Sequence, residues 1–140
     1  MKKILLVSIC FALLSGCKKI IQKTQEQIAE DLIVKAMTDG QWQVLSYNDG
    51  TEYVSEFTNY KFQFKSDRTV DAIKNTATEA TGTWNGDGYK REITTSYAGS
   101  ASSTVQRLNG VWYIAASTWT SVRATQTING KLTTLELKKL

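Results

Sequence analysis

Short runs in which apolar and polar residues alternate begin at residue 41 and continue to the end of the chain. They are rich in Val, Thr, Tyr, Trp and Phe, they are separated by turn-forming residues, and the chain contains no proline. A two-residue period of this kind predicts strands of an antiparallel sheet with one buried face. The expected strands cover residues 41–47, 60–65, 69–74, 80–85, 90–97, 111–118, 121–128 and 131–138.

The turn of the last hairpin predicts its register. Asn129-Gly130 is the strongest two-residue hairpin signal, because both positions of a type I′ turn need a positive φ. The expected cross-strand pairs are Val122 with Leu137, Ala124 with Leu135, Arg123 with Glu136, and Thr125 with Thr134. One face of the hairpin is then apolar and the other is polar with an ion pair, so the pattern and the turn agree.

A second hairpin is predicted where Tyr60, Phe62 and Phe64 alternate with polar residues and lead through a turn at 66–68. Residues 98–104, which are rich in Ala, Gly and Ser, predict a surface loop, with a flexible lid over a cavity as the alternative. Eight short antiparallel strands joined by tight turns indicate an up-and-down barrel or a sandwich.

The segment before the strands shows a helical period instead. Thr24 and Gln27 stand at the spacing of a capping box, and Gly40 is placed to end a helix in the left-handed conformation. We therefore expect one amphipathic helix over about residues 25–38, which packs on the following domain. The alternative, a membrane-surface helix, is disfavoured because acidic residues dominate the polar face. The expected apolar face comprises Ala29, Leu32, Ile33, Ala36 and Met37.

The N-terminus has the pattern of a secretory signal. Lys2 and Lys3 precede an apolar run over residues 4–14, which is about half of the ~20 residues needed to span a bilayer. The run ends in Leu14-Ser15-Gly16-Cys17, which resembles the lipobox of bacterial lipoproteins, in which the cysteine is lipidated before cleavage. The resemblance implies a signal peptide at 1–16, a lipidated tether at 17–24, a helix at 25–39 and a β domain at 40–140.

Charge and cysteine count change the picture in two ways. Removal of residues 1–16 would leave 124 of the 140 residues and lower the formal charge from +4 to +2, because Lys2 and Lys3 are lost. A nearly neutral exported domain is not expected to bind nucleic acid. With Cys10 in the signal and Cys17 lipidated, a disulfide is excluded, so stability must come from an apolar core.

The residue inventory argues against an enzyme. The chain has no histidine, so neither a serine nor a cysteine triad with a histidine base can form, and zinc loses a usual ligand. Glu52, Glu56, Asp67 and Asp71 are expected to be solvated surface acids. The sequence indicates no catalytic residue, no metal site and no cofactor. Residues 85–88, which share part of a calcium-loop pattern, are expected to form a β-turn.

Gly40 and Trp42, placed where the helix leads into the first strand, resemble the start of lipocalin barrels. The whole chain is similar to the lipocalin-like lipoproteins of Bacteroidota, through the lipobox, Gly82-Thr83-Trp84 and the aromatic strand 60–64. This resemblance implies an all-β fold: an eight-stranded antiparallel up-and-down barrel preceded by one amphipathic helix. Arg68 departs from the family, which usually has glycine there, and a positive φ would strain it.

The lipobox places the protein in the cell envelope, and Lys18 after the cysteine is compatible with the outer membrane, on its periplasmic or surface face. Two functions remain open: a carrier of a small hydrophobic ligand, and a protein interaction or inhibitor module with a filled barrel. A carrier would bind its ligand through Trp42, Phe62, Phe64, Trp84 and Trp112. The small residues expected to point inward beside these rings are Ala72, Thr81, Ala116 and Ala124.

Overall fold

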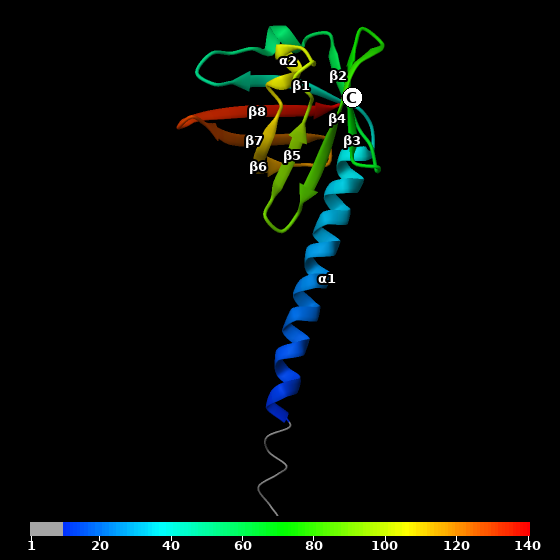
Figure 1. The fold of residues 1–140 in the computed structure, drawn as a ribbon, viewed down its shortest axis with the longest axis vertical. Helices are drawn as coiled ribbons and strands as arrows, with labels where there is room; N and C mark the ends of the chain where they lie inside the picture. Colours follow the sequence, from blue (N-terminus) through cyan, green and yellow to red (C-terminus); the bar gives the residue numbers. More distant parts are fainter. Residues whose placement is uncertain (1–9) are drawn as a thin grey trace, which may run out of the picture.

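A computed structural model describes the backbone of residues 10–140, and the side chains from Ile21 onward except Lys23. Eight antiparallel strands form a closed barrel in the order β1 to β8, which confirms the predicted up-and-down barrel. The barrel sits at one end of a long N-terminal helix (Figure 1). The elements are α1 (Cys10–Thr38), β1 (Trp42–Asn48), η1 (Val54–Phe57), β2 (Tyr60–Phe64), β3 (Thr69–Lys74), β4 (Ala77–Asp87), β5 (Glu92–Ser96), α2 (Ser103–Gln106), β6 (Gly110–Ser117), β7 (Ser121–Ile128) and β8 (Lys131–Lys139).

The predicted register of the last hairpin is confirmed. All four expected pairs occur between β7 and β8, and the Arg123 guanidinium lies 3.6 Å from the Glu136 carboxylate on the outer face. Asn129 and Gly130 both have a positive φ, at 52° and 78°, as a type I′ turn requires.

Replacing Gly130 with valine is expected to lower the free energy of unfolding by about 1–3 kcal/mol, because a β-branched residue at positive φ is strained. Nothing lies within 4 Å of the position that a Cβ would take, so backbone strain is the whole cost. Gly99→Val is the matched control, since Gly99 is equally uncrowded and has no positive φ. Chemical denaturation of both variants checks this, and equal losses would contradict it.

The helix is longer than expected. It begins at Cys10 instead of about residue 25, so Thr24 and Gln27 lie inside it and do not form the predicted N-terminal cap. Residues 10–24 contain no proline, and seven of the fifteen are good helix formers (Ala, Leu, Lys and Gln), so the helix can continue through them. The predicted stop is confirmed, because Gly40 has a φ of 108° just after Thr38.

The C-terminal half of α1 packs against the barrel, as expected. Met37 is buried, and Ile33 packs on the core, but Leu32 was wrongly assigned to this face and is 57% exposed. A Cβ at Gly86 or Gly88 of the β4–β5 hairpin would collide with Ile33 or with the backbone of Ala29. Glycine at these two positions therefore lets the helix approach the sheet closely.

Bulges account for one wrong prediction about the interior. Ala72 and Ala124 point inward as expected, but Ala116 is exposed. The pairing of β6 with β7 shifts between Ile114 and Ala116, and the extra residue moves Ala116 to the outer face opposite Arg123.

Thr81 was also wrongly assigned to the interior. It lies on the outer face and donates a hydrogen bond to Asp71, because the inward positions of β4 are Gly82 and Trp84.

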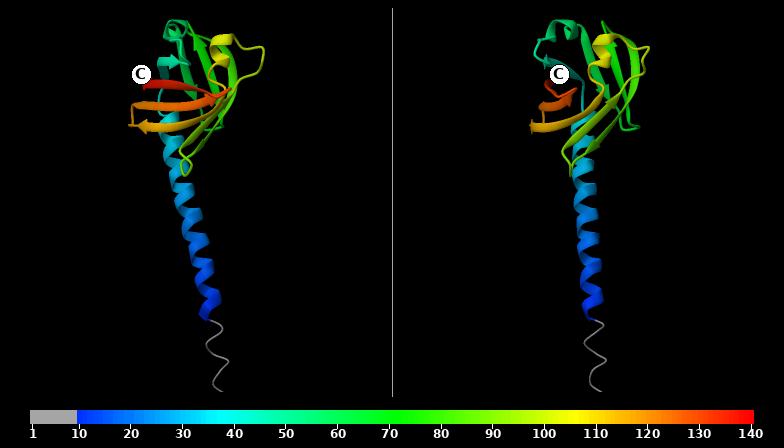
Figure 2. Two further views of the ribbon diagram at one scale, coloured as in Figure 1. Left: turned by 90° about the vertical axis from the view of Figure 1, so that its left-hand side faces the viewer. Right: turned by 60° about the vertical axis from the view of Figure 1, so that its left-hand side comes forward.

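Residues 98–104 were predicted to be a loop, but α2 already begins at Ser103. Ser102 caps this short helix by accepting a hydrogen bond from the Val105 N–H at 3.4 Å, the arrangement typical of an N-cap serine. Residues 98–102 form a loop as predicted, with 98–100 exposed, and the completely buried Val105 of α2, just after the predicted segment, packs over the barrel. Figure 2 shows α2 and η1 on the side of the barrel away from α1.

Candidate functional site

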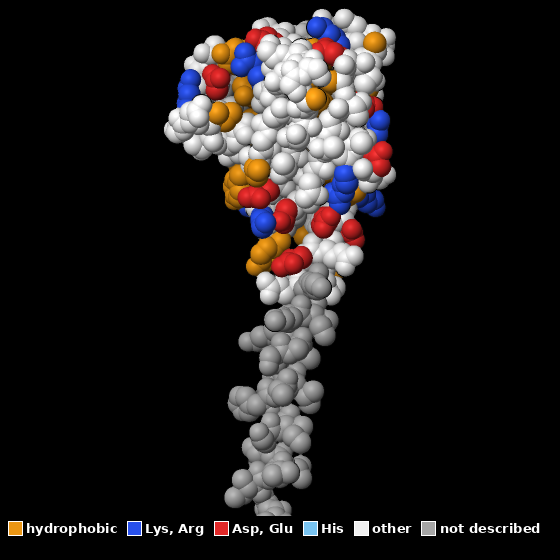
Figure 3. Space-filling model, in the orientation of Figure 1, with side chains coloured by type: hydrophobic (Ala, Val, Ile, Leu, Met, Phe, Trp, Pro, Cys, Tyr) orange, Lys and Arg blue, Asp and Glu red, His pale blue; other side chains and the backbone are white. Residues whose placement is uncertain are grey.

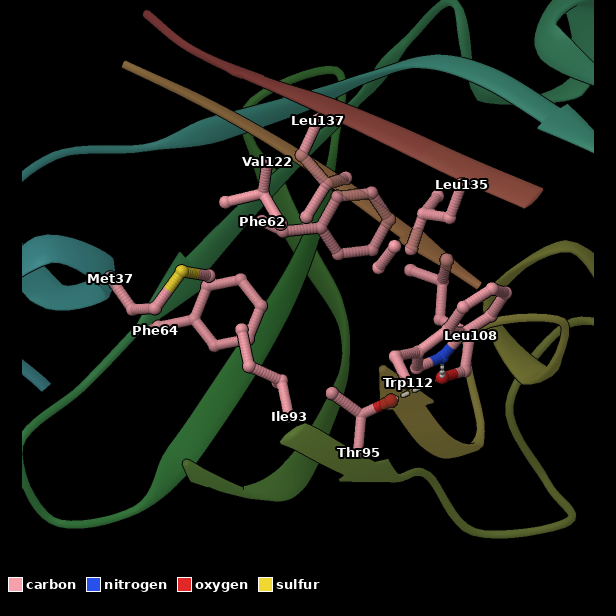
Figure 4. Close-up of a pocket in the computed structure, with 11 residues that line it drawn as sticks. Met37, Phe62, Phe64, Ile93, Thr95, Leu108, Trp112, Val122, Leu135 and Leu137 are labelled. Carbon is pink, nitrogen blue, oxygen red and sulfur yellow. Dashed lines mark hydrogen bonds between the residues drawn. The ribbon is translucent and has the colours of Figure 1, made fainter. Parts of the chain in front are cut away.

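The barrel interior is nearly full. Phe62, Phe64 and Trp112, three of the residues expected to bind a ligand, point inward and line a cavity of about 30 Å³ (Figure 4). This is space for roughly one or two water molecules, whereas small-molecule sites usually enclose about 300–1,000 Å³. The lining residues of the cavity include only two with polar side-chain groups, Thr95 and Trp112. The Thr95 hydroxyl and the Trp112 indole N–H both donate to the Leu108 carbonyl, so neither is available to a ligand. The interior therefore has no room for a lipid or a cofactor.

Trp42 and Trp84 are buried but do not line this cavity. Trp42 lies at the end of α1, where its Nε1–H donates to the Met37 carbonyl at 2.9 Å. This bond satisfies a free carbonyl of the last helical turn. Trp42 therefore closes the α1 end of the barrel, and its contacts are with the protein itself.

The other end is covered by η1 and α2. Phe57 of η1 is completely buried, with ring contacts to Tyr47 and Phe62 at centroid distances of 5.9 and 6.3 Å. Val105 of α2 is equally buried. The end of α1 therefore covers one end of the barrel, and these two apolar residues cover much of the other. Sequence reasoning missed this second closure, because η1 lies in a segment whose polar residues indicate a loop.

An ion pair connects the two closing elements. The Arg107 guanidinium, just after α2, lies 3.2 Å from the Glu56 carboxylate of η1 and stacks on the ring of Tyr53 at 3.6 Å from its centroid. Thr104 adds a hydrogen bond to Glu56 at 3.0 Å. These contacts hold η1 and α2 together over the end of the barrel.

The turn after β2 has a left-handed residue, Arg68. Arg68 has a φ of 69°, a strained conformation for a residue with a Cβ. Its guanidinium reaches the Glu30 carboxylate of α1 at 2.5 Å and stacks over Trp84 at 5.3 Å. These contacts offset the strain and join the turn to the helix. Figure 3 shows charged side chains of both signs gathered where α1 meets the barrel.

Two buried tyrosines differ in how their hydroxyls are satisfied. The Tyr60 hydroxyl donates to Glu79 at 2.5 Å, and hydrogen bonds from Ser102 and Tyr60 lower the pKa of that carboxyl. The Tyr97 hydroxyl has no hydrogen-bond partner among the residues that the structure describes, and burial raises the pKa of Tyr97.

Tyr97→Phe is expected to leave the free energy of unfolding unchanged or to raise it by up to about 1 kcal/mol, because it removes an unsatisfied buried hydroxyl. Tyr60→Phe is the matched control and should lower it by about 1–2 kcal/mol, because it breaks a bond to a carboxylate. Urea denaturation measures both. A larger loss for Tyr97→Phe than for Tyr60→Phe would contradict this assignment.

A large hollow lies on the outside of the barrel, between the first residues of β1 and β2. We call it the seam groove, and it measures about 620 Å³. Its wall mixes polar side chains with the apolar Ile73 and Leu140, and it shares no residue with the interior cavity. The sequence carried no signal for it, because its residues come from four separate segments of the chain. Its lining includes Gln41, Gln43, Asn59, Lys61, Asn75 and Thr76.

Other chemistry has little support. Within the described part of the chain, no three His, Cys, Asp or Glu residues come together as metal ligands. Among the described residues, no helix combines the length and apolar character needed to cross a bilayer. Residues 85–87 belong to β4, so the turn expected at 85–88 lies slightly later in the chain. The expected lipidation site Cys17 lies in α1, its side chain is outside the described part, and so are residues 1–9.

Comparison with known proteins supports the fold. A solved structure described as a DUF4847 family protein from Bacteroides vulgatus ATCC 8482 superposes with a TM-score of 0.53 and 14% sequence identity. The match covers 76% of this chain and 96% of that chain. At this level of identity the similarity concerns the fold alone. No protein-family model and no curated protein sequence matches the chain.

Proposed function

We propose that the chain is a lipid-anchored protein of the cell envelope, similar to the lipocalin-like lipoproteins of Bacteroidota, whose filled barrel serves as a protein interaction module. The observation that carries the proposal is the interior, which leaves a cavity of only about 30 Å³. A carrier of a hydrophobic molecule needs roughly ten times that volume or more. The filled barrel therefore favours binding at the outer surface.

The anchor is proposed from the sequence. Leu14-Ser15-Gly16-Cys17 follows an apolar run with two lysines before it, which is the pattern of a lipoprotein signal. Two or more acyl chains on Cys17 would hold the domain durably, because each buried methylene contributes about 0.8 kcal/mol. The domain needs no catalytic group for this role, in keeping with the absence of histidine from the sequence.

Native mass spectrometry of the lipoprotein released from its own membrane tests the choice between the two functions. A packed module should leave the membrane without a small molecule in its interior, so its mass should equal that of the lipidated chain. A stoichiometric apolar molecule that stays bound, and that disappears when the chain is unfolded, would establish the carrier function instead.

Overpacking gives an independent check. Ala124 is 2% exposed and lines the interior cavity, so Ala124→Leu should lower the free energy of unfolding by about 1–3 kcal/mol in a filled barrel. Ala116 lies on the outer face, and Ala116→Leu is the matched control, with an expected change within about 0.5 kcal/mol. Thermal unfolding followed by circular dichroism measures both. Full tolerance of leucine at 124 would mean that the interior can open to hold a ligand.

A further inference from the structure

The barrel has one weak seam. β2 pairs with β3 along its whole length, whereas β1 and β2 pair at a single position, Trp42 with Phe62. A register shift between Val44 and Ser46 in the pairing with β8 bends β1 beyond this point. From Gln43 onward on β1, and before Phe62 on β2, the facing edges therefore have no ladder partner in each other within the described chain.

The seam groove lies at this opening. Gln41 and Gln43 come from β1 and the segment before it, and Asn59 and Lys61 from β2 and the segment before it. The main-chain groups of Gln43 and Lys61 already face Lys138 of β8 and Ile73 of β3, so the groups that face the opening are those of Val44 and Tyr60. Lys61 is exposed. Backbone N–H and C=O groups at an open strand edge can pair with another extended chain.

The side chains of the groove fit a peptide backbone. Four of the ten residues that line the groove carry a side-chain amide, which offers both a donor and an acceptor, as a peptide group does. Lys61 is its only charged side chain, and its one aromatic residue, Tyr60, is 2% exposed and offers little ring surface. Thr76, on the wall formed by the β3–β4 turn, has a φ of 82°, a strained conformation for a β-branched residue.

We propose that the seam groove binds an extended segment of a partner protein as an added β-strand along the open edges of β1 and β2. Main-chain hydrogen bonds supply the affinity, and the amides of the groove fix the register of the segment. This inference rests on the proposed function, because it names the surface and the kind of partner that an interaction module with a filled interior would use.

Random octapeptides displayed on phage and selected against the full lipidated protein in nanodiscs provide the probe. Lys61→Trp fills the groove at an exposed strand position, where tryptophan is well tolerated. Val111→Trp, at an exposed position on β6 that lies outside the groove, is the matched control. We expect Lys61→Trp to weaken binding of the selected peptides at least about tenfold, and Val111→Trp to change it by less than about twofold.

N-methylation of the selected peptide tests the backbone mechanism on the unaltered protein, so the result does not depend on how a variant folds. Methylation at alternate residues should weaken binding whichever parity is chosen, because the N–H groups of one parity face β1 and those of the other face β2. Amide exchange should slow at Val44 and Tyr60 in the complex, because these residues face the opening between β1 and β2.

Three results would overturn the seam as the binding site. These are selected peptides that bind Lys61→Trp as well as the parent, binding insensitive to N-methylation, and a selection that yields no peptide. In the first two cases the module still binds peptides, so the proposed function survives. A small molecule retained in native mass spectrometry would instead remove the proposed function itself.

Discussion

Replacing Trp42 with alanine is expected to lower the free energy of unfolding by about 3–5 kcal/mol, the largest loss of any single side chain considered for this barrel. The indole is completely buried at the end of α1, and its N–H satisfies the Met37 carbonyl. Removing the indole leaves a cavity and an unpaired Met37 carbonyl, and it takes away an apolar surface against which the end of α1 packs. Since domains of this size are stable by only about 5–15 kcal/mol, the variant should be close to unfolding at 37 °C.

Two variants make the measurement specific. Trp119→Ala is the matched control, because Trp119 also lies beside the Lys139 ammonium but is 47% exposed, and it should cost less than about 0.5 kcal/mol. Trp42→Phe keeps most of the bulk and loses the hydrogen bond, so an intermediate loss of about 1–3 kcal/mol is expected. Guanidinium denaturation compares all three. Equal stability of Trp42→Ala and Trp119→Ala would contradict the closure of the barrel at this end.

Cys17→Ser is expected to abolish lipidation and leave an uncleaved precursor, because a serine hydroxyl cannot form the thioether that precedes lipoprotein signal cleavage. Metabolic labelling with a fatty acid should mark the parent chain and leave the variant unmarked. On gels the variant should run at the precursor mass, which is larger by the residues 1–16.

Cys10→Ser is the matched control for this experiment, because Cys10 lies inside the apolar run and before the proposed cleavage site. It should be labelled, processed and recovered with membranes like the parent. Label retained in Cys17→Ser, or lost in Cys10→Ser, would contradict the assignment of Cys17 as the lipid attachment site.

The strands could be predicted because their information is local. A two-residue period and a turn such as Asn129-Gly130 act within ten residues of each other, so they specify both the strands and the pairing of β7 with β8. The inward direction of Phe62, Phe64, Trp84 and Trp112 follows from the same period. In a barrel whose strands join their neighbours in sequence, local pairs determine the whole architecture.

The features that were missed depend on contacts between distant residues. The bulge that turns Ala116 outward is determined by the pairing register of β6 with β7, and no residue type in β6 predicts it. The closure by η1 depends on Phe57 reaching Tyr47 and Phe62 across the end of the barrel. The seam groove exists because β1 and β2 diverge after one pair, a tertiary property that their outward side chains do not encode.

The length of α1 also determines height above a membrane. From Cys17 to Ala29, where the barrel first meets the helix, the backbone is continuously helical and rises by about 18 Å at 1.5 Å per residue. With lipid on Cys17, a continuous helix of this length would keep the barrel at a distance from the membrane surface. A random coil of equal length would let the barrel approach the bilayer. The barrel would then bind a partner segment within a thin layer parallel to the membrane. Two anchored proteins whose binding sites lie at the same distance from the membrane would encounter each other by diffusion in two dimensions.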